Sequence, residues 1–334
     1  NNRLWGDFNY YTRDDKDQII SVTSAPQSGY STRKMNAGLI RNRGVELSLG
    51  GMPVSTKNWK WEMNFNIAKN SNKLVELADG VDSYSIYWTS FTTRLYNYAM
   101  VGKSLGVITG NTWERDDNGN IIFHELSASQ KALYGGEYVP TYNQNTLDEL
   151  GNFHPDFTGG FNTSISFKNF RLSANIDFSV GGQIVSYTNM WGSSSGILDK
   201  TAELNDRGVN VREPVSKGGG IHMTGVDQNG NKVDTYVNAK LYYTTASRVW
   251  EEWVYDRTYV KLREVSLSYV FPSQTLKKLN IGLSRASVAI NASNPWLIYS
   301  ACPNVDVSEI GMGYFEGGNA AATRSIGFTV NLAF

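Results

Sequence analysis

The sequence predicts an all-β fold: a transmembrane antiparallel β-barrel whose strands have one apolar face and one polar face. Two observations predict it. Apolar and polar residues alternate within eight segments of strand length, and the connections between these segments alternate between long and short. Because successive side chains of a strand point to opposite faces, a period of two places the apolar residues of each segment on one face.

The segment Arg324–Phe334 shows the alternation without a break. Small or polar residues separate its apolar residues, which are Ile326, Phe328, Val330, Leu332 and Phe334. A tilted strand of about 9–11 residues crosses the hydrocarbon core of a membrane. The pattern and the terminal Phe334 favour the closing strand of an outer-membrane barrel, and the edge strand of a soluble sandwich is the alternative for this segment.

Seven further segments repeat the pattern. In chain order they are Leu4–Thr12 (the least regular), Arg43–Gly50, Trp59–Ala68, Phe157–Phe167, Phe170–Val180, Tyr259–Phe271 and Leu279–Ala292. In the third of these, aromatic and aliphatic residues alternate with lysine, glutamate and asparagine. The last two each contain one shift of phase, near Arg263 and Arg285, which is what a β-bulge produces.

The lengths of the connections between these segments predict which end of the sheet is extracellular and which is periplasmic. In chain order they run long, short, long, short, long, short and long, over residues 13–42, 51–58, 69–156, 168–169, 181–258, 272–278 and 293–323. Successive connections between antiparallel neighbours lie at opposite ends of a sheet. Outer-membrane barrels have long extracellular loops and short periplasmic turns. We therefore expect Phe334 at the periplasmic rim.

Charged residues occupy the middle of the polar faces, at Glu46, Lys60, Glu62, Arg171 and Asp177. A charge that faced hydrocarbon at the membrane midplane would cost about 2–4 kcal/mol, so we expect these side chains to point into a polar lumen. Eight strands can close a small barrel. The long loops and the bulky inward side chains favour one arc of a larger barrel.

Composition excludes several classes of function. Lysine plus arginine equals aspartate plus glutamate at 31 each, which gives no support for nucleic-acid binding. No run of about 18 apolar residues predicts a transmembrane helix. The single cysteine, Cys302, and three scattered histidines provide no metal or nucleophile pattern, so we expect no enzymatic activity. The start at Asn1 lacks a signal peptide, and we expect a piece of a longer polypeptide.

One loop has part of the spacing of a calcium-binding loop. Glu114, Asp116, Asn118, Gly119 and Glu125 fall at positions 1, 3, 5, 6 and 12. Position 1 is normally aspartate, and flanking helices are not evident. The alternative, which we favour, is a β-hairpin with an Asn-Gly turn. The stretch Asp227–Asn231 has the same pattern without the distal glutamate.

Aromatic residues crowd the long loops. The rings of Tyr87, Trp88, Trp113 and Trp191 are candidates for ligand contact, because sugars present apolar C–H faces that stack on such rings. The alternative roles are loop packing, a membrane-interface girdle and contact with a partner protein. The stretch Ser247–Tyr255 is compatible with a short helix whose apolar stripe packs the loops.

Several stretches together resemble the SusC/RagA family of TonB-dependent outer-membrane transporters of Bacteroidetes. They are Arg41–Leu49, Trp59–Trp61, Asn66–Asn72, Val101–Gly106, Leu150–Phe157, Phe167–Ser173, Gly181–Gly182, Tyr259–Tyr269 with Pro272, Asn291–Asn294 and Phe334. They occur in family order over nearly the whole chain. The resemblance implies the C-terminal part of the barrel, over residues 1–334, without the plug domain and the earlier strands.

The resemblance also implies an architecture and an activity. The barrel would have 22 strands, of which this chain supplies the last eight, and would lie in the outer membrane as a multi-pass protein. It would import oligosaccharides or, in some members, peptides, with energy supplied through TonB and a SusD-like surface lipoprotein as a lid. No cofactor is expected; a structural Ca²⁺ at Glu114–Glu125 is the disfavoured alternative described above. A passive porin and a soluble carbohydrate-binding β-protein are the alternatives.

Overall fold

The computed structural model describes most of the chain. The described residues are 3–23, 27, 29, 32–36, 38–78, 80–90, 94–144, 147–279, 282–310, 313–318, 320 and 322–334. Of residues 20–23, 32, 33, 35, 36, 87–90 and 279, the backbone alone is described. None of the described helices is both long and apolar enough to cross a membrane.

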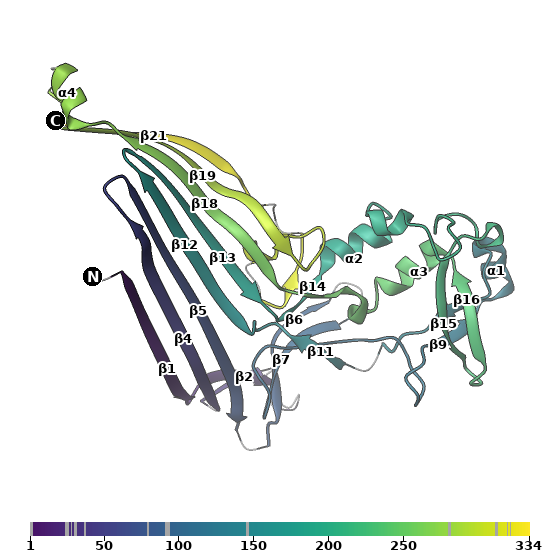
Figure 1. The fold of residues 1–334 in the computed structure, drawn as a ribbon. Coiled ribbons are helices and arrows are strands. Elements are labelled where there is room, and N and C mark those ends of the chain that lie inside the picture. Colours follow the sequence, from purple (N-terminus) through teal and green to yellow (C-terminus); the bar gives the residue numbers. More distant parts are fainter. Residues whose placement is uncertain are drawn as a thin grey trace.

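The largest element is an eight-stranded sheet, which we call the wall (Figure 1). Its strands, in spatial order, are β1 (Leu4–Lys16), β4 (Leu39–Ser55), β5 (Trp59–Glu76), β12 (Phe157–Phe167), β13 (Phe170–Val180), β18 (Tyr259–Val270), β19 (Arg285–Ser300) and β21 (Ser325–Ala333). Every neighbouring pair is antiparallel. These strands are the eight that the alternation predicts, so the all-β class is confirmed. Barrel closure and a total of 22 strands stay predictions.

Short and long connections separate by end, as predicted. Residues 56–58, residues 168–169 and the short helix α4 (Ser273–Leu279) lie at the end where the chain terminates, at the upper left of Figure 1. The long connections lie at the opposite end and contain the remaining strands and helices, which we call the loop layer.

The strand predicted at Leu279–Ala292 has the wrong bounds. The amides of Thr275 and Leu276 bond to the carbonyl of Pro272, and this turn begins α4. The strand β19 therefore starts at Arg285 and continues to Ser300. Proline fixes φ near the helical value, so Pro272 suits the start of α4. The shift of phase near Arg285, which we predicted to be a β-bulge, is instead the point where β19 begins.

The shift near Arg263 is a β-bulge, as predicted. Residues Leu262 and Glu264 pair with Ile176 and Asn175, which are adjacent on β13, so Arg263 is the extra residue. The pairing with β19 is also irregular here, where Asn294 has a φ of 48°. A bulge re-aims a side chain and increases the local twist of a strand.

The two faces of the wall are continuous across strands. On one face, Leu49 pairs with Phe65, Phe65 with Phe161, and Phe161 with Ile176. One residue along, a polar row runs across the other face through Gly50, Asn64, Asn162, Asn175 and Glu264. Because directly opposed residues share a face, the register joins the single-strand patterns into one apolar and one polar surface.

Aromatic residues mark the turn end of the apolar face. Trp59 pairs with Phe167, Phe167 with Phe170, and Phe170 with Tyr269. Ring centroids lie 4.3 Å apart in the first pair and 4.7 Å apart in the last. A row of rings at one height on an apolar sheet face is typical of the aromatic girdles of membrane barrels.

The loop layer contains three small sheets and a hairpin. The first sheet contains β11 (Asp148–Asn152), β8 (Val107–Gly110), β7 (Arg94–Met100) and β6 (Ser83–Ser90), and the second contains β10 (Tyr138–Pro140), β9 (Ile122–Glu125), β15 (Ile221–Asp227) and β16 (Lys232–Val237). The third sheet contains β17 (Val254–Asp256), β14 (Gln183–Ser186) and β20 (Phe315–Glu316). The hairpin is formed by β2 (Ile19–Thr23) and β3 (Thr32–Asn36). Its helices include α1 (Ala128–Tyr134), α2 (Tyr187–Ser194) and α3 (Ala239–Ala246).

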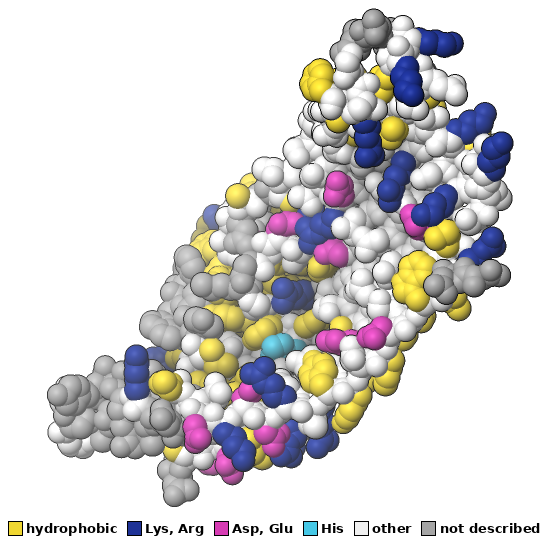
Figure 2. All heavy atoms as spheres, turned by 90° about the vertical axis from the view of Figure 1, so that its left-hand side faces the viewer, with side chains coloured by type: hydrophobic (Ala, Val, Ile, Leu, Met, Phe, Trp, Pro, Cys, Tyr) yellow, Lys and Arg dark blue, Asp and Glu magenta, His cyan; other side chains and the backbone are white. Residues whose placement is uncertain are grey.

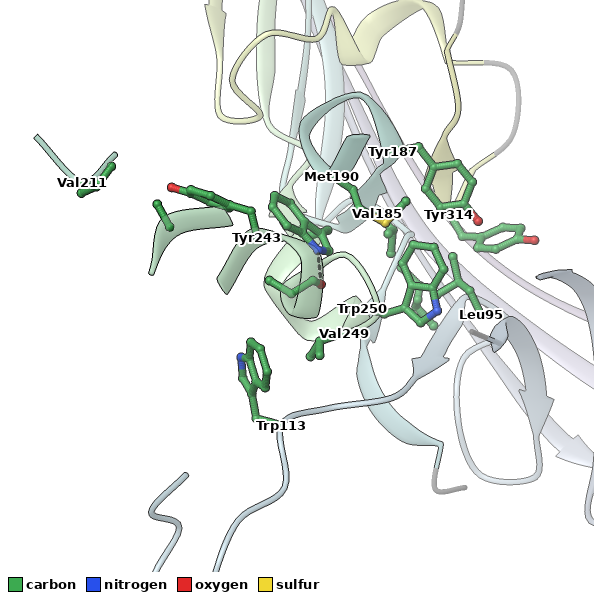
Figure 3. Packing of buried hydrophobic residues seen from close by; sticks show 14 residues of the cluster. Leu95, Trp113, Val185, Tyr187, Met190, Val211, Tyr243, Val249, Trp250 and Tyr314 are labelled. Carbon is green, nitrogen blue, oxygen red and sulfur yellow. Dashed lines mark hydrogen bonds between the residues drawn. The ribbon is translucent and has the colours of Figure 1, made fainter. Parts of the chain in front are cut away.

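Tryptophans form the core of the loop layer (Figure 3). Trp250 and Trp253 are fully buried, and the indole N–H of Trp253 donates to the carbonyl of Ala246 at 2.7 Å. Met190 from α2 and Leu95 from β7 belong to the same cluster. The helix expected within Ser247–Tyr255 is a 3-10 helix at Trp250–Trp253, and its role in loop packing is confirmed.

Candidate ligand-binding face and loop layer

The polar face of the wall contains a groove of about 400 Å³, which we call the wall groove. The indole of Trp5 lies over Gly50 at one side of it. A Cβ atom built on Gly50 would lie 2.1 Å from the Trp5 ring, so only glycine fits beneath that ring. Asn162 and Asn175 line the groove, and their amide groups have no hydrogen-bond partner within the described chain. The wall groove therefore offers one aromatic face and open amide groups to a ligand or to another protein segment.

Charges of both signs border the wall groove. Glu62 accepts from Lys60, with a nitrogen–oxygen distance of 2.7 Å, and lies 3.9 Å from Arg171. Figure 2 looks at the molecule from the left-hand side of Figure 1 and shows acidic and basic side chains interspersed along its length. Mixed signs create no strong field, so recognition at this face would depend on individual hydrogen bonds.

Loop residues 306–309 are held to the wall by ion pairs. The ammonium of Lys261, only 1% exposed, donates to Asp306 and Glu309 at 2.7 Å each and to the Ser308 hydroxyl at 3.0 Å. Burial by itself raises the pKa of the Asp306 carboxyl, but hydrogen bonds from Lys261 and Ser308 outweigh it and hold that pKa below its usual value. The hydrogen bond from Lys261 likewise lowers the pKa of Glu309. A buried charge that is paired in this way makes removal of one partner costly.

Arg263, the bulged residue, joins this network. Its guanidinium forms two hydrogen bonds with Asp177, at 2.8 and 2.9 Å, and also contacts Glu309. The two parallel bonds to one carboxylate fix its direction. Asp177 also accepts from the Tyr259 hydroxyl at 3.1 Å. We call Lys261, Arg263, Asp177, Asp306 and Glu309 the latch, because they connect two wall strands to one loop.

A buried carboxylate positions α2. Glu316, 2% exposed, accepts from the Ser186 hydroxyl at 2.8 Å and from the Thr188 amide at 3.1 Å, and it also contacts the Thr188 hydroxyl. The positive end of a helix dipole stabilises an anion at this point. β20, in the last long connection of the chain, therefore holds the start of α2.

The predicted ligand-contacting aromatic residues are not brought together. Trp113 is 2% exposed; its indole N–H donates to Glu252 at 2.6 Å, and its ring stacks on Tyr242. We predicted that Trp113 contacts a ligand, but its ring is covered and its indole N–H already has a partner. Trp113 therefore packs the loop layer instead. Trp191 on α2 is 43% exposed and stays a candidate. Tyr87 and Trp88 lie on β6, but their side chains lie outside the described residues.

The calcium-like stretch is a hairpin turn. One carboxylate oxygen of Asp116 accepts from the amides of Asn118 and Asn120, and the other accepts from the Asn120 side chain. Gly119 has a φ of 83°, which favours glycine. Asp227 makes the same bonds to Asn229 and Asn231.

The carboxylate of Asp116 is thus occupied within its own turn. Glu114 and Glu125 lie on either side of this hairpin, as a β-hairpin interpretation requires. Among the described residues, no group of three or more histidine, cysteine, aspartate or glutamate side chains is placed to hold a metal. These contacts favour the hairpin over the structural Ca²⁺.

The sequence did not single out the latch or Trp5. Arg263 drew attention through the shift of phase in its strand, and Asp177 through its charge on the polar face. The loop residues that pair with Lys261, however, lie 45 and 48 positions away in the sequence. A strand lysine on the polar face, opposite an Asp-x-x-Glu stretch in the following loop, is the signal that could have suggested them. For Trp5, the glycine opposite it in register is the signal, but the register is known only from the pairing.

Searches against known proteins find related receptors. TonB-dependent receptor P3 of Formosa agariphila is 28% identical over 313 residues, which cover 91% of this chain and 29% of that protein. TonB-dependent receptor P26 of the same organism is 24% identical and covers 100% of this chain and 33% of its own length. TonB-dependent receptor SusC of Bacteroides thetaiotaomicron is 31% identical over 193 residues, or 55% of this chain and 18% of SusC. No protein-family model matches the chain.

Solved structures share the fold. The RagAB peptide importer in its closed-closed state superposes with a TM-score of 0.69 at 18% identity, covering 100% of this chain and 34% of the matched chain. Its open-open state gives a TM-score of 0.68. The chain thus spans about a third or less of the length of the relatives that it matches.

Proposed function

Because the chain belongs to the SusC/RagA family of TonB-dependent receptors, we propose that it forms the last eight strands of an outer-membrane importer. The relatives are receptors and transporters and not enzymes, which confirms the expectation of a non-enzymatic chain. The single observation that carries the proposal is the continuous apolar face of the wall, which no second sheet covers within the described chain.

The dimensions of this face suit a bilayer. β13 has 11 residues, and at about 3.3 Å per residue it rises about 35 Å. A tilt of about 45° reduces this to about 25 Å, the height of the apolar band of membrane barrels. Leu172, Leu267, Ile290 and Phe328 follow one another across four strands and are all exposed. Contiguous exposed apolar surface of this extent needs lipid or protein to cover it.

The edges of the wall suit a larger barrel. β1 and β21 each pair with one neighbour among the described strands, and most side chains of both are exposed. Long open edges promote association with other strands. We infer that the remainder of the same polypeptide supplies the missing neighbours of a 22-stranded barrel, and that a plug domain packs on the polar face.

The transported nutrient is an oligosaccharide or a peptide. SusC-like transport and the RagAB peptide importer support import as the activity, and they leave the two substrate classes open. Apolar side chains exposed on the loop layer, at Trp191, Ile197 and Leu204, support contact with a SusD-like lipoprotein lid. TonB would supply the energy through the part of the polypeptide outside this chain.

The test of membrane insertion uses two adjacent residues on opposite faces. Leu172→Cys, on the apolar face, should react with a lipid-soluble thiol reagent in isolated outer membranes, and Ser173→Cys, in the wall groove, should not. Burial raises the pKa of the native Cys302 thiol to about 12, so it should stay silent. Equal labelling at both positions would sink the proposal.

The test of active import uses whole cells. Uptake of the nutrient by cells that carry the full-length receptor should stop when TonB is deleted. Uptake that continues without TonB would instead identify a passive pore.

A further inference from the structure

A pocket of about 500 Å³ opens in the loop layer, away from the wall groove. We call it the loop pocket. Its walls come from the end of α1, the turn after α2 and the start of α3, and the side chains that matter here are Tyr134, Ser193, Ser195, Arg212, Lys240 and Tyr243. Pockets that bury small ligands have volumes of about 300–1,000 Å³.

Ser193 gives the first indication that the loop pocket binds a ligand. This serine is 1% exposed, and its hydroxyl has no hydrogen-bond partner within the described chain. Buried polar groups in native proteins nearly always have a partner, because leaving one unpaired is unfavourable. A ligand hydroxyl or carboxylate in the loop pocket would supply that partner.

The charged side chains that line the loop pocket are both basic, while Glu203 and Glu252 lie outside the lining near Tyr243. Arg212 donates from Nε to the Thr201 carbonyl at 2.8 Å and from Nη2 to the Thr201 hydroxyl at 2.5 Å, which fixes the guanidinium plane. Its Nη1 and the ammonium of Lys240 have no partner among the described residues, and no carboxylate lines the pocket. Two cations with donors to spare, in a pocket without acidic groups, favour an anionic ligand.

The remaining lining favours a sugar. Ser193 and Ser195 provide hydroxyl groups that both donate and accept, as sugar hydroxyls do, whereas the hydroxyls of Ser194 and Thr201 already donate to the carbonyls of Trp191 and Leu198. Tyr243 gives its hydroxyl hydrogen to the Lys200 carbonyl at 3.0 Å, and burial raises its pKa to about 12, so its ring stays neutral. A peptide bound by strand addition needs an open strand edge, whereas helix ends and a turn form these walls.

We propose that the loop pocket binds a saccharide residue that carries a carboxylate group. Lys240 and Arg212 contact the anionic group, Ser193 bonds to a ring substituent, and the tyrosines pack on the apolar face of the ring. The binding itself requires neither TonB nor the membrane. Its role in capturing an imported glycan rests on the function proposed above.

The test is calorimetric titration of the purified full-length receptor with digalacturonate, with neutral galactobiose as the comparison. Digalacturonate should bind and galactobiose should bind at least tenfold more weakly. Lys240→Gln should weaken digalacturonate binding about tenfold, and Ser193→Ala should weaken it severalfold. Lys232→Gln, which removes an exposed lysine outside the pocket, is the matched control and should bind as the native receptor does.

The other binding outcomes overturn the proposal. No binding of digalacturonate, or equal binding by Lys240→Gln, excludes the loop pocket as an acidic-sugar site. Tighter binding of the dipeptide Asp-Asp would identify an acidic-peptide site instead. Uptake that continues without TonB, with digalacturonate binding intact, would contradict the proposed import function and leave the loop pocket assignment standing.

Discussion

The wall and the loop layer place the same residue types in opposite environments. Trp250 in the loop layer is 0% exposed, whereas Trp296 on the apolar face of the wall is 58% exposed. Phe123 is fully buried in the loop layer, and Phe328 on the wall is 68% exposed. The loop layer therefore has the interior of a water-soluble protein, and the wall turns its apolar side chains outward. The difference is what the proposed function requires, with water around the loop layer and lipid against the apolar face of the wall.

The largest expected effect tests this contrast with two tryptophans. Trp250→Ala should destabilise the loop layer by about 3–5 kcal/mol, because it leaves a cavity in a packed core. Trp296→Ala removes an outward side chain and should have a much smaller effect. Limited proteolysis of the full-length receptor in detergent would measure both. Equal protease sensitivity of the two variants would show that the wall and the loop layer do not differ in this way.

A second pair of substitutions compares the two faces of one wall strand. Ile176→Arg places a charge on the apolar face of β13 and should disfavour membrane assembly by about 2–4 kcal/mol if the residue lies near the midplane. Asn175→Arg adds the same charge to the polar face and should assemble normally. The heat-resistant folded band on an electrophoresis gel would report assembly. Failure of Asn175→Arg alone would reverse the assignment of the faces.

The smallest expected effect concerns the latch, where the two regions meet. Asp306 and Glu309 have lowered pKa values in the folded chain, so their stabilising contribution is present above their unfolded values of about 4. It is lost as the pH falls through the lowered folded values. Acidification below about pH 4 should therefore release the loop and expose Cys302, which packs with Val307.

A thiol reagent that reacts in acid would measure this release as faster labelling of Cys302. Lys261→Met removes the buried ammonium, so its labelling should already be faster at neutral pH and should change less on acidification. Cys302 labelling that is independent of pH in the native receptor would show that the latch does not hold the loop.

Much of the wall could be predicted because its signal is local. Alternation in Phe170–Val180 requires no knowledge of any other strand, and that prediction has the bounds of β13. The bulge at Arg263 was readable as a shift of phase for the same reason. The start of β19 was missed because Leu279, Ile281 and Leu283, which precede the strand, continue the same alternation in the sequence.

The candidate site could be predicted far less well. Trp113 and Trp191 carry the same residue type in long loops, and nothing in their neighbours distinguishes the buried ring from the exposed one. The Asp116 turn was predictable as a hairpin because its hydrogen bonds join residues two and four positions apart. The loop pocket joins α1 to residues that follow its end by 59 positions or more, and no pattern in the sequence connects them.

The sequence by itself determined the strands, their two faces and the end at which the long loops lie. Side chains alternate along any strand, so a short segment with apolar and polar residues in alternation already separates the two faces. The tertiary structure decided which tryptophans are covered, which loop Lys261 and Arg263 hold, and where an unpartnered serine meets two cations. These contacts join distant segments, and they form only where packing of the whole loop layer brings those segments together.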